Sequence, residues 1–488
     1  MNKPSPADFK ADDDKFHEEC GVFGIFGNAA APAMTVLGLH ALQHRGQEAA
    51  GIVSYDGQQF YSERHIGLVG DNFTKQSVID RLIGNRAIGH NRYSTTGAPV
   101  LRNVQPLFAE FAGGGFAVAH NGNLTNARVL QTKLQKRGSI FQSTSDTETI
   151  IHLIATSTAG QLVDRFIDAL RQLEGAFALV ALSEKKLIGC RDPLGVRPLV
   201  LGTFEGAYIL ASETCALDII GAEFVRDIEP GELVVITEEG LRSLRPFDNH
   251  QPRFCIFEFV YFSRPDSYVA GANVYEVRKQ IGRELAKESP ADADIVIPVP
   301  DSGTPAAIGF AEAVGLPFDL GIIRNHYVGR TFIEPTDSIR HMGVKLKHNA
   351  NRAMLKDKRV ILVDDSIVRG TTSIKIVEMV REAGAREVHM RIASPPTVGS
   401  CYYGVDTPES SKLIASQMSV EDMAEKIGVD SLSYISLEGL YRAVGVAERD
   451  PQNPGYCDAC FTRDYPTQLT DQSVRDDFRP TSLLAEAG

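Results

Sequence analysis

The sequence lacks several features that mark broad classes of protein. No apolar run approaches the roughly 20 residues needed to cross a membrane. The first 19 residues, MNKPSPADFKADDDKFHEE, contain no apolar core of the kind that a secretory signal requires. The net charge of −12 provides no basic field for general nucleic-acid binding, although it is compatible with a local basic pocket for a small phosphorylated substrate.

Cysteine is scarce as well, with seven residues and no secretory signal. This usage favours a reducing cytoplasm, in which thiols serve catalysis, metal binding or packing rather than disulfides. Cys190 and Cys215 lie in apolar, strand-like surroundings, so we expect both to be packing residues. The roles of the other five cysteines depend on the motifs around them.

The length and composition predict a globular protein with more than one core. The chain has 488 residues, of which 43% are hydrophobic and 23% charged. We expect two domains, at 20–250 and 251–470, joined near the polar, proline-rich stretch 246–252. Residues 1–19 are polar and acidic and are expected to be disordered or removed. Residues 471–488 are expected to form a loosely held surface tail.

The stretch 360–373, VILVDDSIVRGTTS, combines an apolar strand, two acids and a hydroxyl-rich turn. Asp364 and Asp365 come at the carboxyl end of the strand, where open α/β sheets bind ligands. A helix is predicted after the turn, and backbone N–H groups at such a helix start, with hydroxyls beside them, can hold a phosphate. The alternative interpretation is an ordinary solvated acidic pair on a loop.

A second strand–loop–helix unit spans 293–315, with a glycine-containing turn at 301–304 that suits close backbone approach to a pyrophosphate. Two such units at this spacing predict a parallel, doubly wound sheet. Between them, 324–352 is basic and irregular. It is either a solvated charged loop or a lid whose Arg330 or Lys345 closes over pyrophosphate and excludes water.

The first half begins at Cys20 with CGVFGIFG, which predicts a buried strand. Polar motifs follow at 44–48 (HRGQE), 89–97 (GHNRYSTTG), 120–124 (HNGNL) and 145–148 (SDTE). Taken singly, Asp146 could be a helix N-cap, Asn121 and Gly122 a tight turn, and Cys20 a packed core cysteine. The apolar runs farther along predict layered sheets with helices outside, and 191–199 (RDPLGVRPL) is expected to be structural or inter-domain.

Together and in this order, these motifs resemble those of class II glutamine amidotransferases, a branch of the N-terminal-nucleophile hydrolases. The resemblance implies an αββα sandwich and removal of the leader between Glu19 and Cys20. Cys20 would then attack glutamine as a thiolate, using its own α-amine, which titrates near ~8, as the base. The oxyanion donors would be the Asn121 side chain and the Gly122 N–H. The implied glutamine-binding residues are Arg92 (α-carboxylate), Asp146 (α-ammonium), Thr95 and Gly46.

The second half resembles phosphoribosyltransferases that use phosphoribosyl pyrophosphate (PRPP). In that family the paired acids hydrogen-bond the ribose hydroxyls and the following loop holds the 5′-phosphate. The implied PRPP-binding residues are Asp301, Ser302, Gly303, Asp364, Asp365, Ser366, Arg369, Gly370, Thr371 and Thr372. Magnesium binds such sites mainly through pyrophosphate and water, and the resemblance places Ser302, Asp364 and Asp365 around it.

Four cysteines remain: Cys255, Cys401, Cys457 and Cys460. The pair in CDAC (457–460) has a chelating spacing, but that spacing alone leaves zinc, redox and iron–sulfur uses open. Cys255 and Cys401 have no local partner. Resemblance to amidophosphoribosyltransferases of the processed type, which carry four cysteines at these places, implies one [4Fe–4S] cluster.

The order of the two halves resembles the amidophosphoribosyltransferases. The resemblance implies that ammonia from glutamine displaces pyrophosphate from C1 of PRPP and gives 5-phosphoribosylamine, the first committed step of purine synthesis. It also implies feedback inhibition by purine nucleotides and a homotetramer. The alternatives are a hexosamine-phosphate or asparagine-forming class II enzyme, which would lack 360–373, and a non-catalytic PRPP-sensing regulator, which should show a basic DNA-binding surface.

Overall fold

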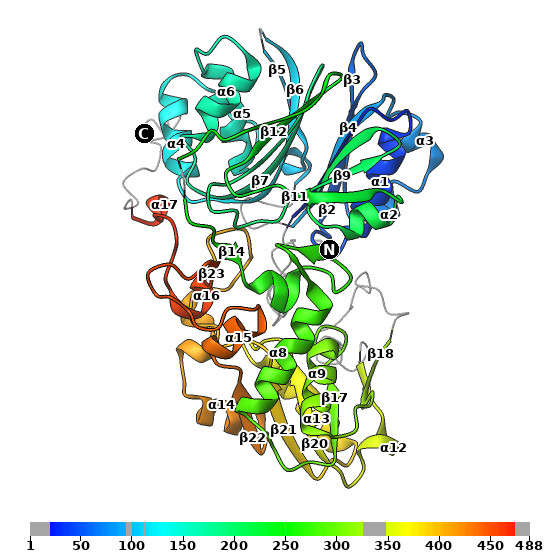
Figure 1. Cartoon of the computed structure of the whole chain (residues 1–488), viewed down its shortest axis with the longest axis vertical. Helices are drawn as coiled ribbons and strands as arrows, with labels where there is room; N and C mark the ends of the chain where they lie inside the picture. The colour runs from blue at the N-terminus through cyan, green and yellow to red at the C-terminus, as the bar shows by residue number, and fades with distance from the viewer. Residues whose placement is uncertain (1–19, 94–99, 112, 249, 326–347, 474–488) are drawn as a thin grey trace, which may run out of the picture.

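The computed structural model describes residues 20–93, 100–111, 113–248, 250–325 and 348–473. The leader, Thr95, Arg330 and Lys345 therefore lie outside the described residues. The chain forms two halves stacked along its long axis, with the N-terminal half above and the C-terminal half below in Figure 1. No described helix is both long and apolar enough to span a membrane.

The N-terminal half contains two antiparallel sheets. The seven-stranded sheet has the order β11 (Glu223–Asp227), β9 (Val200–Phe204), β10 (Ala207–Ala211), β1 (Gly21–Phe26), β4 (Arg86–Arg92), β2 (Ala49–Tyr55) and β3 (Phe60–Ile66). The six-stranded sheet has the order β13 (Gly240–Leu244), β12 (Leu233–Thr237), β8 (Leu187–Arg191), β7 (Gly175–Ser183), β6 (Gly114–Leu124) and β5 (Leu107–Phe111). Cys20 directly precedes β1, which is a central strand.

The two sheets face each other and helices cover their outer faces. Apolar side chains of both sheets, such as Val22 and Ile88 from one and Ala119 and Val180 from the other, form one buried cluster between them. Helix α1 (Ala31–Ala41) packs on the seven-stranded sheet with α7 (Cys215–Asp218). Helices α4 (Ala127–Lys136), α5 (Asp146–Thr156) and α6 (Leu162–Leu170) pack on the six-stranded sheet. These four layers confirm the predicted αββα sandwich. The expected packing residues are buried in the clusters between each sheet and its covering helices, Cys190 under the six-stranded sheet and Cys215 under the seven-stranded sheet.

The C-terminal half is built on a parallel sheet of β17 (Ile295–Pro298), β20 (Arg359–Asp364), β21 (Glu387–Ile392) and β22 (Ser431–Tyr434), in that order. Ile361 and Val363 face the cluster formed with α8 (Val274–Glu288) and α9 (Thr304–Val314). Val360 and Leu362 face the cluster formed with α13 (Thr371–Glu382) and α14 (Val420–Ile427). Because helices cover both faces, the sheet is doubly wound, as predicted.

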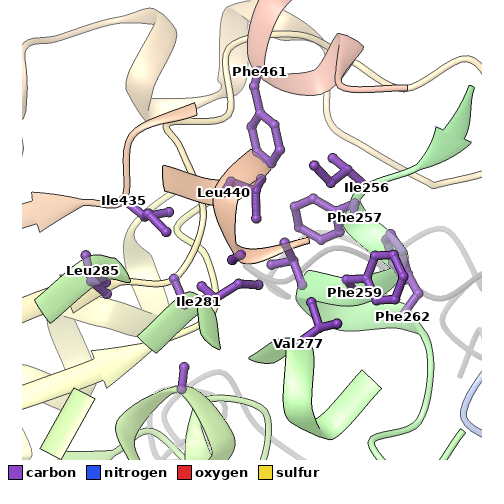
Figure 2. Packing of buried hydrophobic residues seen from close by; sticks show 14 of the residues in the cluster. Ile256, Phe257, Phe259, Phe262, Val277, Ile281, Leu285, Ile435, Leu440 and Phe461 are labelled. Carbon is purple, nitrogen blue, oxygen red and sulfur yellow. The ribbon is translucent and has the colours of Figure 1, made fainter. Parts of the chain in front are cut away.

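Between the halves, short strands and a π-helical turn form the junction. Strand β14 (Phe254–Cys255) pairs in parallel with β23 (Tyr456–Cys457), so that Cys255 lies opposite Cys457. The π-helical turn, Glu258–Phe262, follows at once. Figure 2 shows Phe257, Phe259 and Phe262 of this region packed among Ile281, Leu440 and Phe461 of the C-terminal half.

The start of the expected tail is not loose. Residues 471–473 lie in α17 (Thr470–Ser473). The Asp471 carboxylate accepts hydrogen bonds from the backbone N–H groups of Arg128 and Val129, at 2.8 and 3.1 Å, at the start of α4. Figure 1 shows α17 beneath this helix. The C-terminal end of the described chain thus returns to the N-terminal half.

Three local predictions differ from the structure. Asn121 and Gly122 form no tight turn, because both are inside β6 and pair with Ala178 and Phe177 of β7. Asp146 is not the N-cap of α5, because that position belongs to Ser145, whose hydroxyl accepts from the Thr147 N–H. The segment 324–352 is not irregular throughout, since β18 (Ile322–Arg324) pairs with β19 (His348–Ala350).

The remaining elements are short. They are α2 (Val69–Asn72), α3 (Gln76–Ile79), α12 (Arg352–Leu355), α15 (Leu437–Ala443), α16 (Ala459–Thr462), β15 (Tyr268–Val269) and β16 (Ala272–Asn273), with 3₁₀ turns at Leu101–Asn103, Ser410–Lys412 and Ile414–Ser416.

Candidate active sites and cysteine cavity

Cys20 lies half-buried at the start of β1, beside the end of β4. Gly21 pairs with Asn91, which brings Cys20 next to Arg92 and Tyr93. The Cys20 thiol donates to the Tyr93 carbonyl oxygen at an S···O distance of 3.4 Å. Burial raises the pKa of this thiol to about 11, against the lowering effects of that hydrogen bond and of Arg92. At neutral pH the thiol is therefore protonated, and a reaction that needs the thiolate also needs a base.

Groups of opposite charge flank Cys20. The Arg92 side chain is 3% exposed and lies 3.8 Å from the carboxylate of Glu48. Asp146, at the first position of α5, accepts the Leu124 N–H at 3.1 Å and lies 3.7 Å from Nδ1 of His120. Burial would raise the pKa of Asp146, but His120 and the hydrogen bonds lower it overall, so Asp146 is ionised at neutral pH. A cation and an anion that both lie near the Cys20 thiol suit a zwitterionic ligand.

Asn121 is fully buried, and neither its amide nitrogen nor its amide oxygen has a hydrogen-bond partner among the described residues. A buried amide left in this state is costly, which makes Asn121 a candidate for binding a ligand. The next residue, Gly122, has φ +136°, and a Cβ there would lie 2.1 Å from the Ala176 carbonyl oxygen. Only glycine therefore fits at this position.

Gly46 packs against the end of β4, next to Arg92. A Cβ on Gly46 would lie 2.6 Å from the carbonyl carbon of Asn91 and 2.8 Å from the backbone of Arg92. The turn after α1 can therefore approach the end of β4 closely only with glycine here. Thr95, the fourth residue implied for glutamine binding, lies outside the described residues.

In the C-terminal half, the two predicted loops meet at the carboxyl ends of β17 and β20. The Ser302 hydroxyl donates to the Asp365 carboxylate, which also accepts from the Ser366 hydroxyl at 2.6 Å. Asp364 accepts the Asp365 N–H at 2.9 Å, and both acids are 3% exposed. A Cβ on Gly303 would lie 2.5 Å from the Val363 carbonyl oxygen, so this glycine allows the loops to pack together.

The residues implied for phosphate binding lie at the start of α13. Gly370 is its N-cap with φ +83°, and the helix begins at Thr371, so that Thr371 and Thr372 are in its first turn. Arg369 directly precedes this start. Asp301 differs from its neighbours because its side chain is 57% exposed and pairs with Arg324 of β18. This arrangement supplies hydroxyl and N–H donors beside two carboxylates.

The four remaining cysteines converge on one cavity. Pairing of β14 with β23 brings Cys255 to Cys457, and α16 carries Cys460. The Cys460 carbonyl oxygen accepts the Val398 and Gly399 N–H groups, both at 2.9 Å, which brings in the segment that leads to Cys401. Besides the cysteines, the cavity is lined by Val196, Arg197, Phe257, Phe262, Tyr403, Val405, Thr407 and Ala459.

These cysteines are free thiols in mostly apolar surroundings. Burial raises the pKa of Cys457 to about 12 and that of Cys255 further. Among the described residues, no three His, Cys, Asp or Glu side chains are already arranged to hold a metal ion. Four thiols on one cavity are nevertheless the type of donor set that thiophilic metals prefer.

A buried ion network, which sequence reasoning missed, joins the halves. Arg45 is fully buried, pairs with Glu213 of its own half, and contacts Glu258 of the other at 2.6 Å. Arg197 also approaches Glu258, at 3.4 Å. Through Arg197, the stretch 191–199 thus contacts the other half, which agrees with one of its two predicted roles, the inter-domain one. The available signal was a lone carboxylate, Glu258, inside the apolar run CIFEFVYF.

Comparisons with known proteins agree with this architecture. A family model described as a glutamine amidotransferase domain matches residues 90–218, and one described as a phosphoribosyl transferase domain matches residues 271–409. The amidophosphoribosyltransferase of Rhizobium etli is 58% identical over 489 residues, covering 99% of this chain and 99% of its own. That of Bacillus subtilis is 49% identical over 459 residues, covering 94% and 96%.

A solved structure agrees over nearly the whole chain. Glutamine PRPP amidotransferase from B. subtilis, in complex with ADP and GMP, has a TM-score of 0.88 and 48% identity, covering 94% of this chain and 98% of that one. Identity at this level over both halves shows more than a shared fold. The chain belongs to the amidophosphoribosyltransferases, the glycosyltransferases of purine biosynthesis that form 5-phosphoribosylamine, glutamate and pyrophosphate from glutamine, PRPP and water.

Proposed function

We propose that the reaction is divided between the two sites. In the N-terminal half the Cys20 thiolate attacks the side-chain amide of glutamine and releases ammonia. In the C-terminal half that ammonia displaces pyrophosphate from C1 of PRPP. The assignment of Cys20 rests on a protonated, half-buried thiol beside Arg92. The same half contains the Asn121 side-chain amide, which has no hydrogen bond to any described residue.

The base is proposed to be the α-amine of Cys20 itself. In the full chain this nitrogen is in the peptide bond to Glu19, where it has no basic lone pair. Removal of residues 1–19 frees an amine that titrates near ~8 and is partly neutral at physiological pH. The raised pKa of the thiol makes such a base necessary, because burial disfavours spontaneous ionisation. The leader is thus a propeptide in this proposal.

The binding roles follow from charge. Arg92 holds the α-carboxylate of glutamine and Asp146 its α-ammonium group, with Gly46 and Thr95 lining the pocket. When the thiolate attacks, negative charge develops on the amide oxygen. The Asn121 amide and the Gly122 N–H are the proposed donors to that oxyanion. A buried amide without a hydrogen bond to any described residue is suited to this use.

PRPP is proposed to bind at the two loops of the parallel sheet. Asp364 and Asp365 hold the ribose hydroxyls. The loop that contains Ser366, Arg369 and Gly370, together with the start of α13 at Thr371 and Thr372, holds the 5′-phosphate. Asp301, Ser302 and Gly303 lie beside the pyrophosphate. Phosphoribosyltransferase domains use Mg²⁺, and Ser302, Asp364 and Asp365 are its proposed neighbours, consistent with the clustering of these oxygens.

The cysteine cavity is proposed to hold a [4Fe–4S] cluster, ligated by Cys255, Cys401, Cys457 and Cys460. Support comes from four thiols on one mostly apolar cavity and from the chelating pair in CDAC. Asp458 fixes that loop, because its buried carboxylate accepts from Arg449 at 2.6 Å and from the Tyr441 hydroxyl at 2.8 Å.

Iron analysis of anaerobically purified protein should find about four irons per chain. Active, colourless, iron-free protein would reject the cluster.

Regulation and assembly are also proposed by similarity. The B. subtilis structure contains ADP and GMP, so purine nucleotides are the proposed feedback inhibitors here as well. A homotetramer in the cytoplasm is the proposed working form. Mass photometry of the purified chain measures its oligomeric state directly.

The Cys20→Ser variant tests the division of labour. It should abolish glutamine-dependent formation of phosphoribosylamine and leave ammonia-dependent formation unchanged, both measured as pyrophosphate release. Cys190→Ala removes a buried packing thiol from the same half and should retain both activities. Loss of both activities in Cys20→Ser, or loss of neither, would refute the assignment of Cys20.

A further inference from the structure

The segment 401–405 (CYYGV) connects the cysteine cavity to the strand that carries Asn121 and Gly122. Three alternate residues of the segment, Cys401, Tyr403 and Val405, line the cavity. Between these residues, Tyr402 and Gly404 contact β6 in the N-terminal half. The segment therefore contacts the cavity with one set of residues and the candidate oxyanion site with the other.

The contact with β6 is close and is made largely through the backbone. Gly404 has φ +117°, and a Cβ there would lie 3.0 Å from the Cα and 3.1 Å from the carbonyl carbon of Gly122. One residue further along β6, the Asn123 side-chain amide donates to the Tyr402 carbonyl oxygen at 2.9 Å. Gly122 also packs closely on β7, because a Cβ at this position would lie 2.1 Å from the Ala176 carbonyl oxygen.

The other side of the segment is held by a buried cation. The Arg197 guanidinium, which is fully buried, donates through Nε to the Tyr403 carbonyl oxygen at 2.8 Å. The Tyr403 N–H donates to the Cys401 sulfur at 3.3 Å, and its hydroxyl lies 3.0 Å from the Thr467 hydroxyl. The segment is therefore held on both of its faces, and only a few contacts separate Cys401 from Gly122.

We propose that segment 401–405 positions the oxyanion donors of the glutamine site, with Gly404 and Asn123 as its positioning residues. The C-terminal half thereby supplies part of the support for catalysis in the N-terminal half. The proposal rests on the proposed role of Asn121 and Gly122. Misplacing catalytic donors by about 1 Å costs roughly 100-fold in rate, so a small displacement of Gly122 is sufficient to be measured.

The test is Gly404→Ala, matched with Gly57→Ala. Both glycines have positive φ (+117° and +102°), but a Cβ on Gly57 meets no atom within 4 Å. Gly404→Ala should lower the glutamine-dependent kcat by about 10- to 100-fold, with the KM for glutamine and the ammonia-dependent rate near those of the unaltered chain. Gly57→Ala should leave all three near the unaltered values.

Asn123→Ala provides a second variant should Gly404→Ala fail to fold. It removes the hydrogen bond to Tyr402 without inserting an atom, and it should lower the same kcat in the same selective way. Equal loss of the glutamine- and ammonia-dependent rates, or an unchanged glutamine-dependent kcat, would overturn the proposal. If the proposed function were wrong, a different result would be seen: the Cys20→Ser variant would still form phosphoribosylamine from glutamine.

Discussion

Asn121 and Asn126 are both buried in the N-terminal half, but their side-chain amides differ in hydrogen bonding. Both polar atoms of the Asn121 amide are buried and have no partner among the described residues. The Asn126 amide, by contrast, donates to the Gln172 carbonyl oxygen at 2.9 Å and accepts the Glu174 N–H at 3.1 Å. An unsatisfied buried polar group costs about 1–3 kcal/mol. The fold therefore holds the Asn121 amide at a cost in stability.

Asn121→Ala and Asn126→Ala separate catalysis from stability. Asn121→Ala removes a proposed oxyanion donor but no hydrogen bond to a described residue, so it should lower the glutamine-dependent kcat by about 100- to 1000-fold with little change in thermal stability. Asn126→Ala loses two hydrogen bonds and should destabilise the protein by about 1–3 kcal/mol while its kcat changes little. Steady-state kinetics and thermal unfolding measure both. An Asn121→Ala chain with unchanged kcat would contradict the oxyanion assignment.

At the scale of elements, the ends of β17 and β20 meet as one site because both strands are parallel neighbours. Ser302 comes from the loop after β17, and Asp364 and Asp365 from the end of β20. The opposite ends of the same strands carry a separate ion pair, Asp294 with Arg359 at 2.8 Å. Carboxylates thus lie at both the amino and the carboxyl ends of these strands, but only the carboxyl ends have the start of α13 beside them.

Asp365→Asn, compared with Asp294→Asn, tests the carboxyl edge. The proposed hydrogen bond from the ribose to the charged Asp365 carboxylate would contribute about 1.5–3 kcal/mol, so Asp365→Asn should raise the KM for PRPP by roughly 10- to 100-fold with either nitrogen donor. Asp294→Asn, at the other edge, should leave that KM unchanged. Initial rates at varied PRPP measure it, and equal effects of the two variants would argue against a ribose contact.

Glu232, which directly precedes β12, makes a pH-dependent contribution to stability. Burial would raise the pKa of Glu232, but hydrogen bonds from Arg226 and Ser243 outweigh burial and lower it from 4.5 to about 2. Because the native pKa is depressed, the contribution is present above pH 4.5 and is lost as pH falls toward 2.

Glu232→Gln should therefore destabilise the protein most at neutral pH, and its difference from the unaltered chain should shrink as pH falls below 4.5. Glu229→Gln, which alters an exposed pair with Arg245, should have a small effect. Thermal unfolding between about pH 7 and about pH 3 measures both. A difference for Glu232→Gln that grows on acidification would show the sign to be wrong.

At the scale of the whole molecule, the two halves are joined by charges as well as by apolar packing, because Ala176 and Val196 of the N-terminal half belong to the same buried cluster as Phe257 of the C-terminal half. Glu258 is buried between Arg45 and Arg197, both of which come from the N-terminal half. Removing one partner of a buried ion pair leaves an uncompensated charge and costs about 3–5 kcal/mol. The junction is therefore sensitive to this single carboxylate.

Glu258→Gln should lower thermal stability strongly, and Glu312→Gln should barely change it. Glu312 pairs with Lys279 and Arg283 at the surface, where its side chain is 46% exposed, and such pairs contribute about 0–1 kcal/mol. Differential scanning calorimetry measures both variants. Equal melting temperatures for the two would mean that the buried network does not hold the halves together.

The sequence by itself determined the two chemistries, their order, and the two sheet architectures. In the second half a local pattern carried the prediction, because 360–373 combines a strand, two acids and a helix start in one short stretch. The chemistry of Cys20 was instead implied by the resemblance of several motifs, taken together, to a known family. Strand alternation and apolar runs likewise predicted the layers. Secondary structure that depends on residues close together in the chain can be predicted from the spacing of apolar and polar residues.

Only the tertiary structure decided which distant residues meet. It brought Cys255 and Cys401, which are far apart in the chain, onto one cavity with the CDAC pair. It paired Glu258 with Arg45 and placed the backbone of segment 401–405 against β6. Contacts of this kind are set by packing of whole layers, and no spacing along the chain encodes them.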